Sequence, residues 1–136
     1  MPKIFTSPTQ QIGKIGEDIA EKFLVKHGFE IMDRNYTKKW GEIDLVAEKD
    51  SRVYFIEVKS VRRDNLRAET RQSLDEYKPE DNMHPWKMKR MGRTIQSYLL
   101  DKKIPEDREW QVDLLVVFID SKNRLARVKV VNDIIL

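Results

Sequence analysis

The sequence predicts one α/β domain in which a helix, three strands, a second helix and two further strands follow one another. Apolar residues recur at helical spacing over residues 10–27 and 86–102. Stretches of alternating or continuous apolar residues, typical of strands, lie at 29–36, 43–47, 53–59, 110–119 and 125–131. A chain of 136 residues buries roughly two-thirds of its unfolded surface in a single core, so we expect residues 1–136 to form one domain.

The first helix is expected over 10–27, and Gly28 would end it. It contains Gly13 and Gly16, although glycine weakens a helix because the unfolded backbone has more freedom to lose. Two glycines in the first turns therefore indicate a close approach of the helix backbone to another group. We favour tight packing of the helix on a sheet over contact with a ligand.

Three charged side chains interrupt the apolar pattern of the hairpin predicted over 43–59: Asp44, Glu57 and Lys59. Side chains alternate across a strand, so Glu57 and Lys59 point to one face, and the short turn can bring Asp44 beside them. A buried charge without a partner costs several kcal/mol. The hairpin is therefore expected to hold two carboxylates and an ammonium close together, with a partner for their charge.

Two neighbouring carboxylates indicate a metal site, since carboxylate oxygens are ligands that Mg²⁺ or Mn²⁺ prefers, with water and a substrate phosphate in the other positions. Such a cation lowers the pKa of a bound water, and Lys59 would orient that water or stabilise the developing negative charge. In the alternative interpretation, Asp44 and Glu57 pair with Lys59 and nearby arginines on the solvated face of a half-exposed sheet. The hairpin residues alone leave both interpretations open.

Between the hairpin and the second helix, residues 61–85 lose apolar periodicity and contain two prolines. We expect a long flexible segment there, in which Leu66 and Leu74 would allow a short helix. Residues 1–8 are expected to be a mobile tail. Asp113 interrupts the buried strand that follows the second helix, and we interpret it as a structural hydrogen-bonding residue ahead of a site residue.

Composition narrows the class of protein. The chain has no cysteine, which excludes disulfides and thiolate metal sites and fits a reducing cytoplasm. Its N-terminus does not resemble a signal peptide, and no apolar run approaches the length needed to cross a membrane. We therefore expect a cytoplasmic protein without a membrane partner. The two histidines lie in separate segments and predict no metal site.

Basic residues are gathered in short clusters, although 26 basic and 23 acidic residues leave a net charge of only +3. Such clusters suit a polyanion, while a solvated surface is the commoner explanation of any one of them. The basic cluster on the first turns of the second helix would form a phosphate site with the helix N-terminus. The candidate nucleic-acid-binding residues are Lys38, Lys39, Arg62, Arg63, Lys87, Lys89 and Arg90.

The spacing of Asp44, Glu57 and Lys59 resembles the metal-binding core of the PD-(D/E)xK nuclease superfamily, and the order of elements resembles its αβββαβ core. More specifically, the chain is similar to the YraN-like family of small bacterial proteins over most of its length. The blocks that carry this resemblance are Gly13-x-x-Gly16-Glu17-x-x-Ala20, Arg34-Asn35-Tyr36, Gly41-Glu42-Ile43-Asp44-Leu45, Phe55-Ile56-Glu57-Val58-Lys59, Pro85-x-Lys87 leading into Tyr98-Leu99, and Val112-Asp113. The resemblance implies a restriction-endonuclease-like fold, with a mixed central sheet flanked by helices.

The resemblance also implies roles for single residues, by similarity to restriction enzymes and archaeal Holliday-junction resolvases. Asp44, Glu57 and the Val58 carbonyl would bind Mg²⁺ or Mn²⁺. Lys59 would be the catalytic lysine. Glu17 would be a further acidic residue brought to the same site by the first helix.

The resemblance further implies that Lys87 contacts a substrate phosphate. The segment after the hairpin departs from the family pattern, because Val61 stands where an arginine is common and Arg62 and Arg63 are displaced. The metal site is unaffected by this departure, whereas the surface that would contact substrate is altered.

Two functional hypotheses follow. The first is a Mg²⁺- or Mn²⁺-dependent endonuclease that cuts structured or branched DNA, which the intact triad of Asp44, Glu57 and Lys59 favours. The second is a non-catalytic nucleic-acid-binding module of the same fold, motivated by the dispersed basic residues and the altered segment after Lys59. A resolvase-like role would also imply a symmetric homodimer, since cutting two strands of a junction requires two sites related by a two-fold axis.

Overall fold

The computed structural model describes residues 8–78, 84–134 and 136. The elements are α1 (Pro8–Lys26), β1 (Glu30–Lys38), β2 (Gly41–Lys49), β3 (Arg52–Arg62), the 3₁₀ turn η1 (Leu66–Ala68), α2 (Arg71–Asp75), α3 (Pro85–Asp101), β4 (Trp110–Asp120) and β5 (Leu125–Val131). The predicted order of elements is confirmed, with η1 and α2 added between β3 and α3. The tail expected at residues 1–8 lies outside the described residues except for Pro8, where α1 begins.

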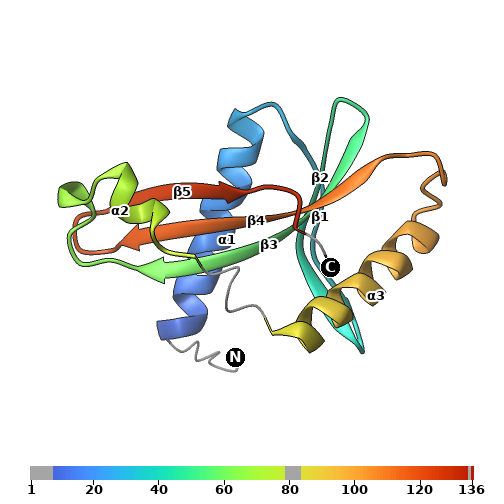
Figure 1. Cartoon of the computed structure of the whole chain (residues 1–136), viewed down its shortest axis with the longest axis horizontal. Coiled ribbons are helices and arrows are strands. Elements are labelled where there is room, and N and C mark those ends of the chain that lie inside the picture. Colours follow the sequence, from blue (N-terminus) through green and yellow to red (C-terminus); the bar gives the residue numbers. More distant parts are fainter. Residues whose placement is uncertain (1–7, 79–83, 135) are drawn as a thin grey trace, which may run out of the picture.

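The five strands form one mixed sheet in the order β1-β2-β3-β4-β5. Neighbouring strands are antiparallel except β3 and β4, which run parallel. Parallel neighbours need a crossover connection, and η1, α2 and α3 lie within it, as the path from green to orange in Figure 1 shows. The mixed sheet flanked by helices that the sequence indicated is therefore confirmed.

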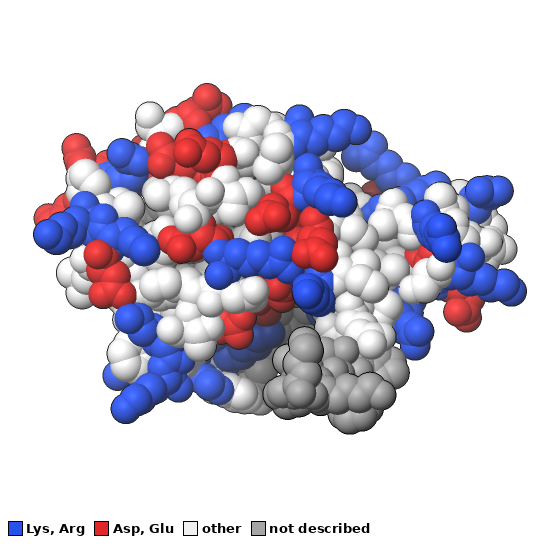
Figure 2. Space-filling model, turned by 180° about the vertical axis from the view of Figure 1, so that it is seen from behind, with Lys and Arg blue, Asp and Glu red and all other residues white. Residues whose placement is uncertain are grey.

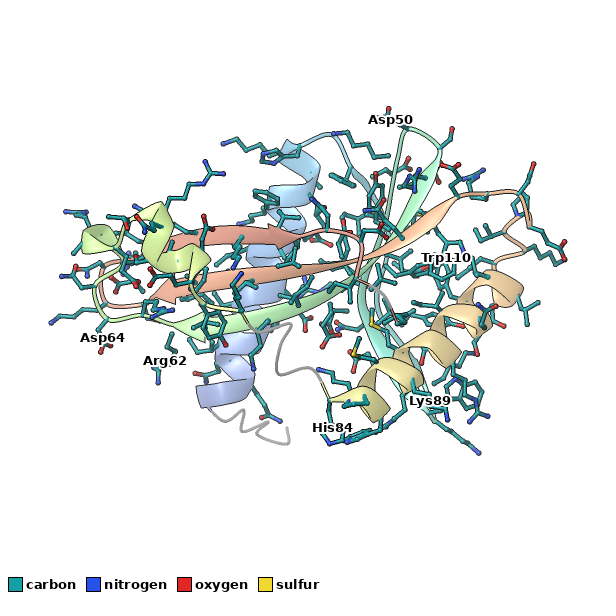
Figure 3. All side chains as sticks on the ribbon, in the orientation of Figure 1. Asp50, Arg62, Asp64, His84, Lys89 and Trp110 are labelled. Atoms are coloured by element: carbon teal, nitrogen blue, oxygen red, sulfur yellow. The ribbon has the colours of Figure 1, made fainter. Side chains whose placement is uncertain are left out.

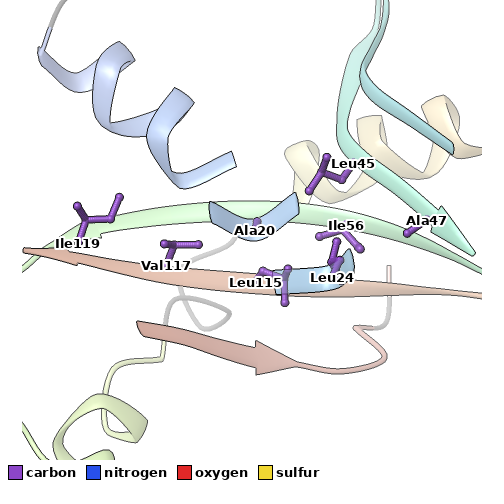
Figure 4. Packing of buried hydrophobic residues seen from close by; sticks show 8 residues of the cluster. All are labelled: Ala20, Leu24, Leu45, Ala47, Ile56, Leu115, Val117 and Ile119. Carbon is purple, nitrogen blue, oxygen red and sulfur yellow. The ribbon is translucent and has the colours of Figure 1, made fainter. Parts of the chain in front are cut away.

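Helix α1 covers one face of the sheet. Its small and apolar residues pack on side chains that alternate out of β2, β3 and β4, which gives a continuous core (Figure 4). The cluster consists of Ala20, Leu24, Leu45, Ala47, Ile56, Leu115, Val117 and Ile119. It holds α1 at a fixed distance from β3, and this sets the position of the acidic residue Glu17 on the same helix.

Two separate clusters cover the opposite face. Helix α3 packs on one end of the sheet, where Ile95 and Tyr98 meet Phe55. The short elements η1 and α2 supply Leu66 and Leu74 to the other end. Side chains alternate along β3, so Glu57 and Lys59 lie on the face that Phe55 occupies, and both follow Phe55 along the strand.

Only one of the two glycines in α1 is packed closely. A Cβ atom on Gly16 would lie 1.9 Å from Ser60 Oγ and 3.0 Å from Ser60 Cβ, whereas a Cβ on Gly13 would have no atom within 4 Å. Glycine at position 16 lets the backbone of α1 approach β3. The prediction of tight packing is confirmed for Gly16 and is wrong for Gly13.

The segment 61–85 contains two short helices in its described part. Thr70 Oγ1 accepts a hydrogen bond from Ser73 N at 3.1 Å and so caps α2. Leu66 and Leu74 are buried, as a short helix in this segment would require. Residues 79–83 lie outside the described residues, so the flexibility of the whole segment stays a prediction.

Asp113 is a structural residue. Its side chain is 5% exposed, and Oδ1 accepts hydrogen bonds from Gln111 Nε2 at 2.8 Å and from Asp133 N at 2.9 Å. These bonds tie the C-terminal segment to β4, where Ile134 N also donates to Val112 O. Across the described residues, no helix is both long enough and apolar enough to span a membrane.

Candidate metal site and nucleic-acid interface

The candidate site lies where β2 and β3 part. Their antiparallel ladder runs from the turn to the pair Leu45 and Ile56 and stops there. One further step would set Asp44 opposite Glu57. Instead, Asp44 Oδ2 accepts a hydrogen bond from the backbone N–H of Val58 at 2.8 Å. The end of the ladder therefore brings two carboxylates together, as the hairpin pattern predicted.

The carboxyl group of Asp44 is buried beside other acidic side chains. Burial, together with the neighbouring negative charge of Glu57, raises the pKa of Asp44 to about 8. The hydrogen bond from Val58 opposes this shift, while Glu17 and Glu42 add to it. Close to neutral pH the protein therefore keeps a proton on Asp44. A divalent cation beside the two carboxylates would favour loss of that proton.

Helix α1 contributes Glu17 to the same region. Asn35, in the middle of the Arg34-Asn35-Tyr36 block, donates from Nδ2 to Glu17 Oε1 at 3.0 Å and to Glu42 Oε1 at 2.9 Å. Asn35 has a φ of 54°, in the left-handed region that asparagine tolerates better than most residues. Its amide thus bridges acidic residues of α1 and β2, and Arg34 Nη2 lies 3.5 Å from Glu17 Oε1.

Helix α3 brings a cation to the carboxylates. Lys87 Nζ lies 2.5 Å from Glu57 Oε1, and the side chain of Glu57 is only 13% exposed. Burial acts to lower the pKa of Lys87, but the hydrogen bond and charge of Glu57 outweigh it, so the pKa is raised. Lys87 was expected to contact phosphate. The structure places its ammonium on a predicted metal ligand.

A hollow of about 270 Å³ adjoins the two carboxylates, between the hairpin and α3. Its lining residues are Gly41, Glu42, Asp44, Glu57, Trp86, Lys87, Arg90 and Met91. Lys59 is exposed on the same face of β3 but is not among these residues. The structure thus brings Asp44 and Glu57 together. Glu17 is near enough to raise the pKa of Asp44 through its charge but does not line the hollow, and Lys59 is left at the margin.

The donor set fits a hard divalent cation. Mg²⁺ in proteins is commonly held by one or two carboxylates together with water and substrate phosphate. Asp44 and Glu57 could supply the two carboxylates. Val58, whose carbonyl is the third predicted ligand, is already held against Asp44 through its N–H. No set of three or more His, Cys, Asp and Glu side chains arranged for a metal ion occurs among the described residues.

The predicted nucleic-acid-binding residues divide into two groups. Lys38 pairs with Asp101 at 2.9 Å, Arg63 with Glu69 at 3.6 Å and Lys87 with Glu57, so these three are engaged within the protein. The exposed side chains of Lys39, Arg62, Lys89 and Arg90 have no carboxylate partner in the part of the chain that the structure describes. Figure 3 places Arg62 at the end of β3 and Lys89, with His84, at the start of α3.

Several residues at the site were not predicted. Asn35 and Glu42 lie within blocks that carried the family resemblance, which is the signal that could have found them. Trp40, Trp86 and Arg93 carried no signal in the sequence, because their proximity depends on how α3 packs against the hairpin.

Comparison with known proteins identifies relatives over most of the chain. The model of the family described as "Uncharacterised protein family UPF0102" matches residues 16–131. A UPF0102 protein of Caldicellulosiruptor bescii is 30% identical over 125 residues, which cover 91% of this chain and 96% of the relative. A UPF0102 protein of Campylobacter jejuni is 38% identical over 105 residues, covering 77% and 81%. One of Dictyoglomus thermophilum is 32% identical over 116 residues, covering 85% and 89%.

Proposed function

From the premise that this chain belongs to the uncharacterised protein family UPF0102, the YraN-like family that its motifs indicated, we propose that it is a Mg²⁺- or Mn²⁺-dependent endonuclease of the PD-(D/E)xK type. Its substrate is structured or branched DNA. The reaction is hydrolysis of a phosphodiester bond.

The observation that carries this proposal is the pair Asp44 and Glu57 at the end of the β2–β3 ladder. Two carboxylates held side by side repel each other, and burial together with this repulsion raises the pKa of Asp44 to about 8. A structural ion pair would not need a second acid facing the first. A site that takes up a divalent cation does need both, because the ligands must supply enough negative charge to hold it.

Different residues of the chain would have different roles in the reaction. A bound cation would supply charge neutralisation on the phosphate and a lowered pKa for the attacking water. Asp44 and Glu57 would hold the cation, and Lys59 or Lys87 would stabilise negative charge on the phosphate oxygens. The oxygen of water bonds to phosphorus and gives up a proton to solvent. The bond to one ester oxygen breaks, and that oxygen leaves and takes up a proton.

A second candidate function is a non-catalytic nucleic-acid-binding module. The observation that favours it is the position of the two lysines: Lys87 is paired with Glu57, and Lys59 lies outside the hollow. In that case the ion pair of Lys87 with Glu57 permanently takes the place of a cation, and the carboxylates serve only to position α3 against the sheet.

The test is cleavage of end-labelled duplex, single-stranded, flap, four-way-junction and RNA-hairpin substrates with Mg²⁺, Mn²⁺ or EDTA. We expect metal-dependent cutting of a structured DNA by the wild type. Glu57→Gln and Lys59→Ala should abolish it, whereas Glu106→Gln, at an exposed loop position, should not. Binding of a substrate without cutting under any condition would favour the second candidate. Cutting that survives in Glu57→Gln would contradict the assigned site.

A further inference from the structure

A row of aromatic and arginine side chains runs beside the carboxylate hollow, along α3 and the turn between β1 and β2. It consists of Trp86, Arg90, Trp40 and Arg93, and we call it the stacking platform. We propose that this platform binds unpaired nucleotides, with a base stacked on Trp86 and phosphates held by the surrounding cations. The inference rests on the proposed function only in naming the substrate: nucleic acid with a single-stranded segment.

The platform is held together by alternating contacts. The guanidinium carbon of Arg90 lies 4.9 Å from the centre of the Trp86 ring, and Arg90 Nε donates to Trp40 O at 2.9 Å. The guanidinium carbon of Arg93 lies 4.3 Å from the centre of the Trp40 ring. Each arginine is therefore oriented by a tryptophan residue, which lowers the entropy lost when a ligand binds.

Glycine at position 41 allows this arrangement. A Cβ atom there would lie 2.5 Å from Thr94 Oγ1 and 3.2 Å from the carbonyl oxygen of Arg90. The start of β2 therefore approaches the backbone of α3 closely. This brings the turn that carries Trp40 against the helix face that carries Arg90 and Arg93.

Trp86 is unusual for its exposure. It is 52% exposed, whereas Phe55, Tyr98 and Phe118 are fully buried in the core. Its ring is fixed from one side by Arg90 and lies 5.3 Å from that of His84. A planar apolar surface that is held in place yet open to solvent suits a planar apolar ligand. A nucleobase is such a ligand, and stacking of this kind requires a base that is not paired within a duplex.

The charges along the stacking platform favour a polyanion as the ligand. Lys39, Lys89, Arg90 and Arg93 are all exposed and have no carboxylate partner within the described ranges, whereas Lys38, next to Lys39 in the chain, is paired with Asp101. Four cations without carboxylate partners, along a platform that ends in an exposed aromatic ring, match the two chemical parts of a single strand, the phosphates and the bases.

The location of the platform connects it to the carboxylates. Trp86 and Arg90 also line the hollow that contains Asp44 and Glu57. A strand that stacks on Trp86 therefore passes beside the proposed metal ligands. The preferred substrate is then a flap, an open end or a branch, in which unpaired nucleotides lie next to the bond to be cut.

Binding without turnover tests the inference independently of cleavage. Fluorescence anisotropy in EDTA would compare a thymidine oligonucleotide of about 12 nucleotides, a length within the usual site size, with an abasic oligonucleotide and a duplex of equal length. We expect Trp86→Ala to weaken binding of the thymidine oligonucleotide on the order of 5- to 150-fold, the range of one base stack. Trp86→Phe should retain most of the affinity, since its ring still stacks.

The controls separate stacking from charge and from folding. Trp86→Ala should not change binding of the abasic oligonucleotide, which has phosphates but no bases. Trp110→Ala, toward the other end of α3 (Figure 3), should not change binding of either. In the wild type the oligonucleotide should quench tryptophan fluorescence. Most of this quenching should be lost in Trp86→Phe, where only Trp40 of the platform still reports, and kept in Trp110→Phe. This measurement remains informative even if Trp86→Ala is unstable.

Two results would overturn the inference: equal loss of affinity for thymidine and abasic oligonucleotides in Trp86→Ala, or tighter binding of the duplex with no effect of Trp86. Neither result depends on catalysis. If single strands bind through Trp86 but no substrate is cut, the platform stands and the endonuclease proposal fails. If DNA is cut and Trp86 has no effect on binding, the endonuclease proposal stands and the stacking platform fails.

Discussion

At the scale of single residues, Asp44 combines a structural cost with a proposed chemical use. Its carboxylate is held by Val58 N–H but faces Glu57, and its pKa is raised to about 8 from 3.8. Lys87 relieves Glu57 but does not bond to Asp44. The protein thus tolerates a carboxyl group that stays protonated near neutral pH, as expected of a site whose second ligand ionises only when a cation arrives.

Asp44→Asn should make the metal-free protein more stable at alkaline pH. Between pH 3.8 and about 8 the folded state keeps a proton that the unfolded state has lost, so the free energy of unfolding of the wild type falls as pH rises. Asparagine is neutral throughout and can still accept from Val58. Urea unfolding in EDTA should show a gain of roughly 2–4 kcal/mol at pH 8 that shrinks toward pH 5.

The control for this prediction is Glu106→Gln, which removes an exposed carboxylate and should leave stability unchanged at both pH values. An Asp44→Asn protein that is less stable than the wild type by the same amount at pH 5 and pH 8 would show that Asp44 is ionised and well paired in the folded state.

At the scale of secondary-structure elements, the two helices contribute opposite charges to one region. Helix α1 brings Glu17, and α3 brings Lys87. The position of each depends on a glycine: Gly16 lets α1 approach Ser60 of β3, and Gly41 lets the hairpin approach α3. Close backbone packing at these two positions thus sets the distances between the charged groups.

Gly16→Ala and Gly13→Ala should change stability in opposite directions. Alanine at position 16 would place a Cβ against Ser60, so the helix or the strand must shift, and we expect a loss of about 1–2 kcal/mol. Alanine at position 13 meets nothing and should gain about 0.5–1 kcal/mol from helix propensity alone. Denaturant unfolding measures both.

A second substitution checks the cause. Ser60→Ala removes the oxygen that a Cβ at position 16 would meet first, and it should restore part of the stability lost in Gly16→Ala. Additive effects of the two substitutions would show that Ser60 does not limit the approach of α1.

Lys87→Ala should strengthen metal binding, because the lysine ammonium competes for Glu57. The pair is partly exposed, since the Lys87 side chain is 57% accessible, so the gain should be modest, about 1.5- to 5-fold in the dissociation constant of Mn²⁺ measured by calorimetry. Lys89→Ala, which removes an exposed lysine from the same helix, should have no effect. Weaker Mn²⁺ binding in Lys87→Ala would mean that the lysine supports the site instead of competing for it.

At the scale of the whole molecule, the elements could be predicted because apolar periodicity is a local property. The last strand was expected at Leu125–Val131 and lies there. The role of Asp113 also followed from its place in a buried strand. The short helices η1 and α2 are only three and five residues long, so periodicity could indicate a helix in that segment but not its position.

The site was predicted in part for a similar reason. Asp44 and Glu57 belong to one hairpin, and their proximity follows from strand geometry. The contact of Lys87 with Glu57 and the stacking of Arg93 on Trp40 join residues of different elements. Such contacts depend on how α3 packs on the sheet, and a single sequence carries no local signal for that packing.

The distribution of charge over the surface leads to the last prediction. Seen from behind in Figure 2, acidic and basic side chains intermingle, and the acidic ones gather near the middle. With a net charge of +3, the molecule as a whole attracts a polyanion only weakly. Binding should therefore depend on the few cations that lack acidic partners.

For a single strand that contacts Lys39, Lys89, Arg90 and Arg93, the logarithm of the binding constant should fall with the logarithm of salt concentration at a slope of about −3. Lys39→Ala should make the slope shallower by about 0.7, since one phosphate contact is lost. Its neighbour Lys38 is paired with Asp101, so Lys38→Ala should leave the slope almost unchanged. Anisotropy titrations between about 50 and 200 mM salt measure the slopes. Equal effects of the two lysines would show that net charge, and not the unpaired cations of the stacking platform and its surroundings, determines binding.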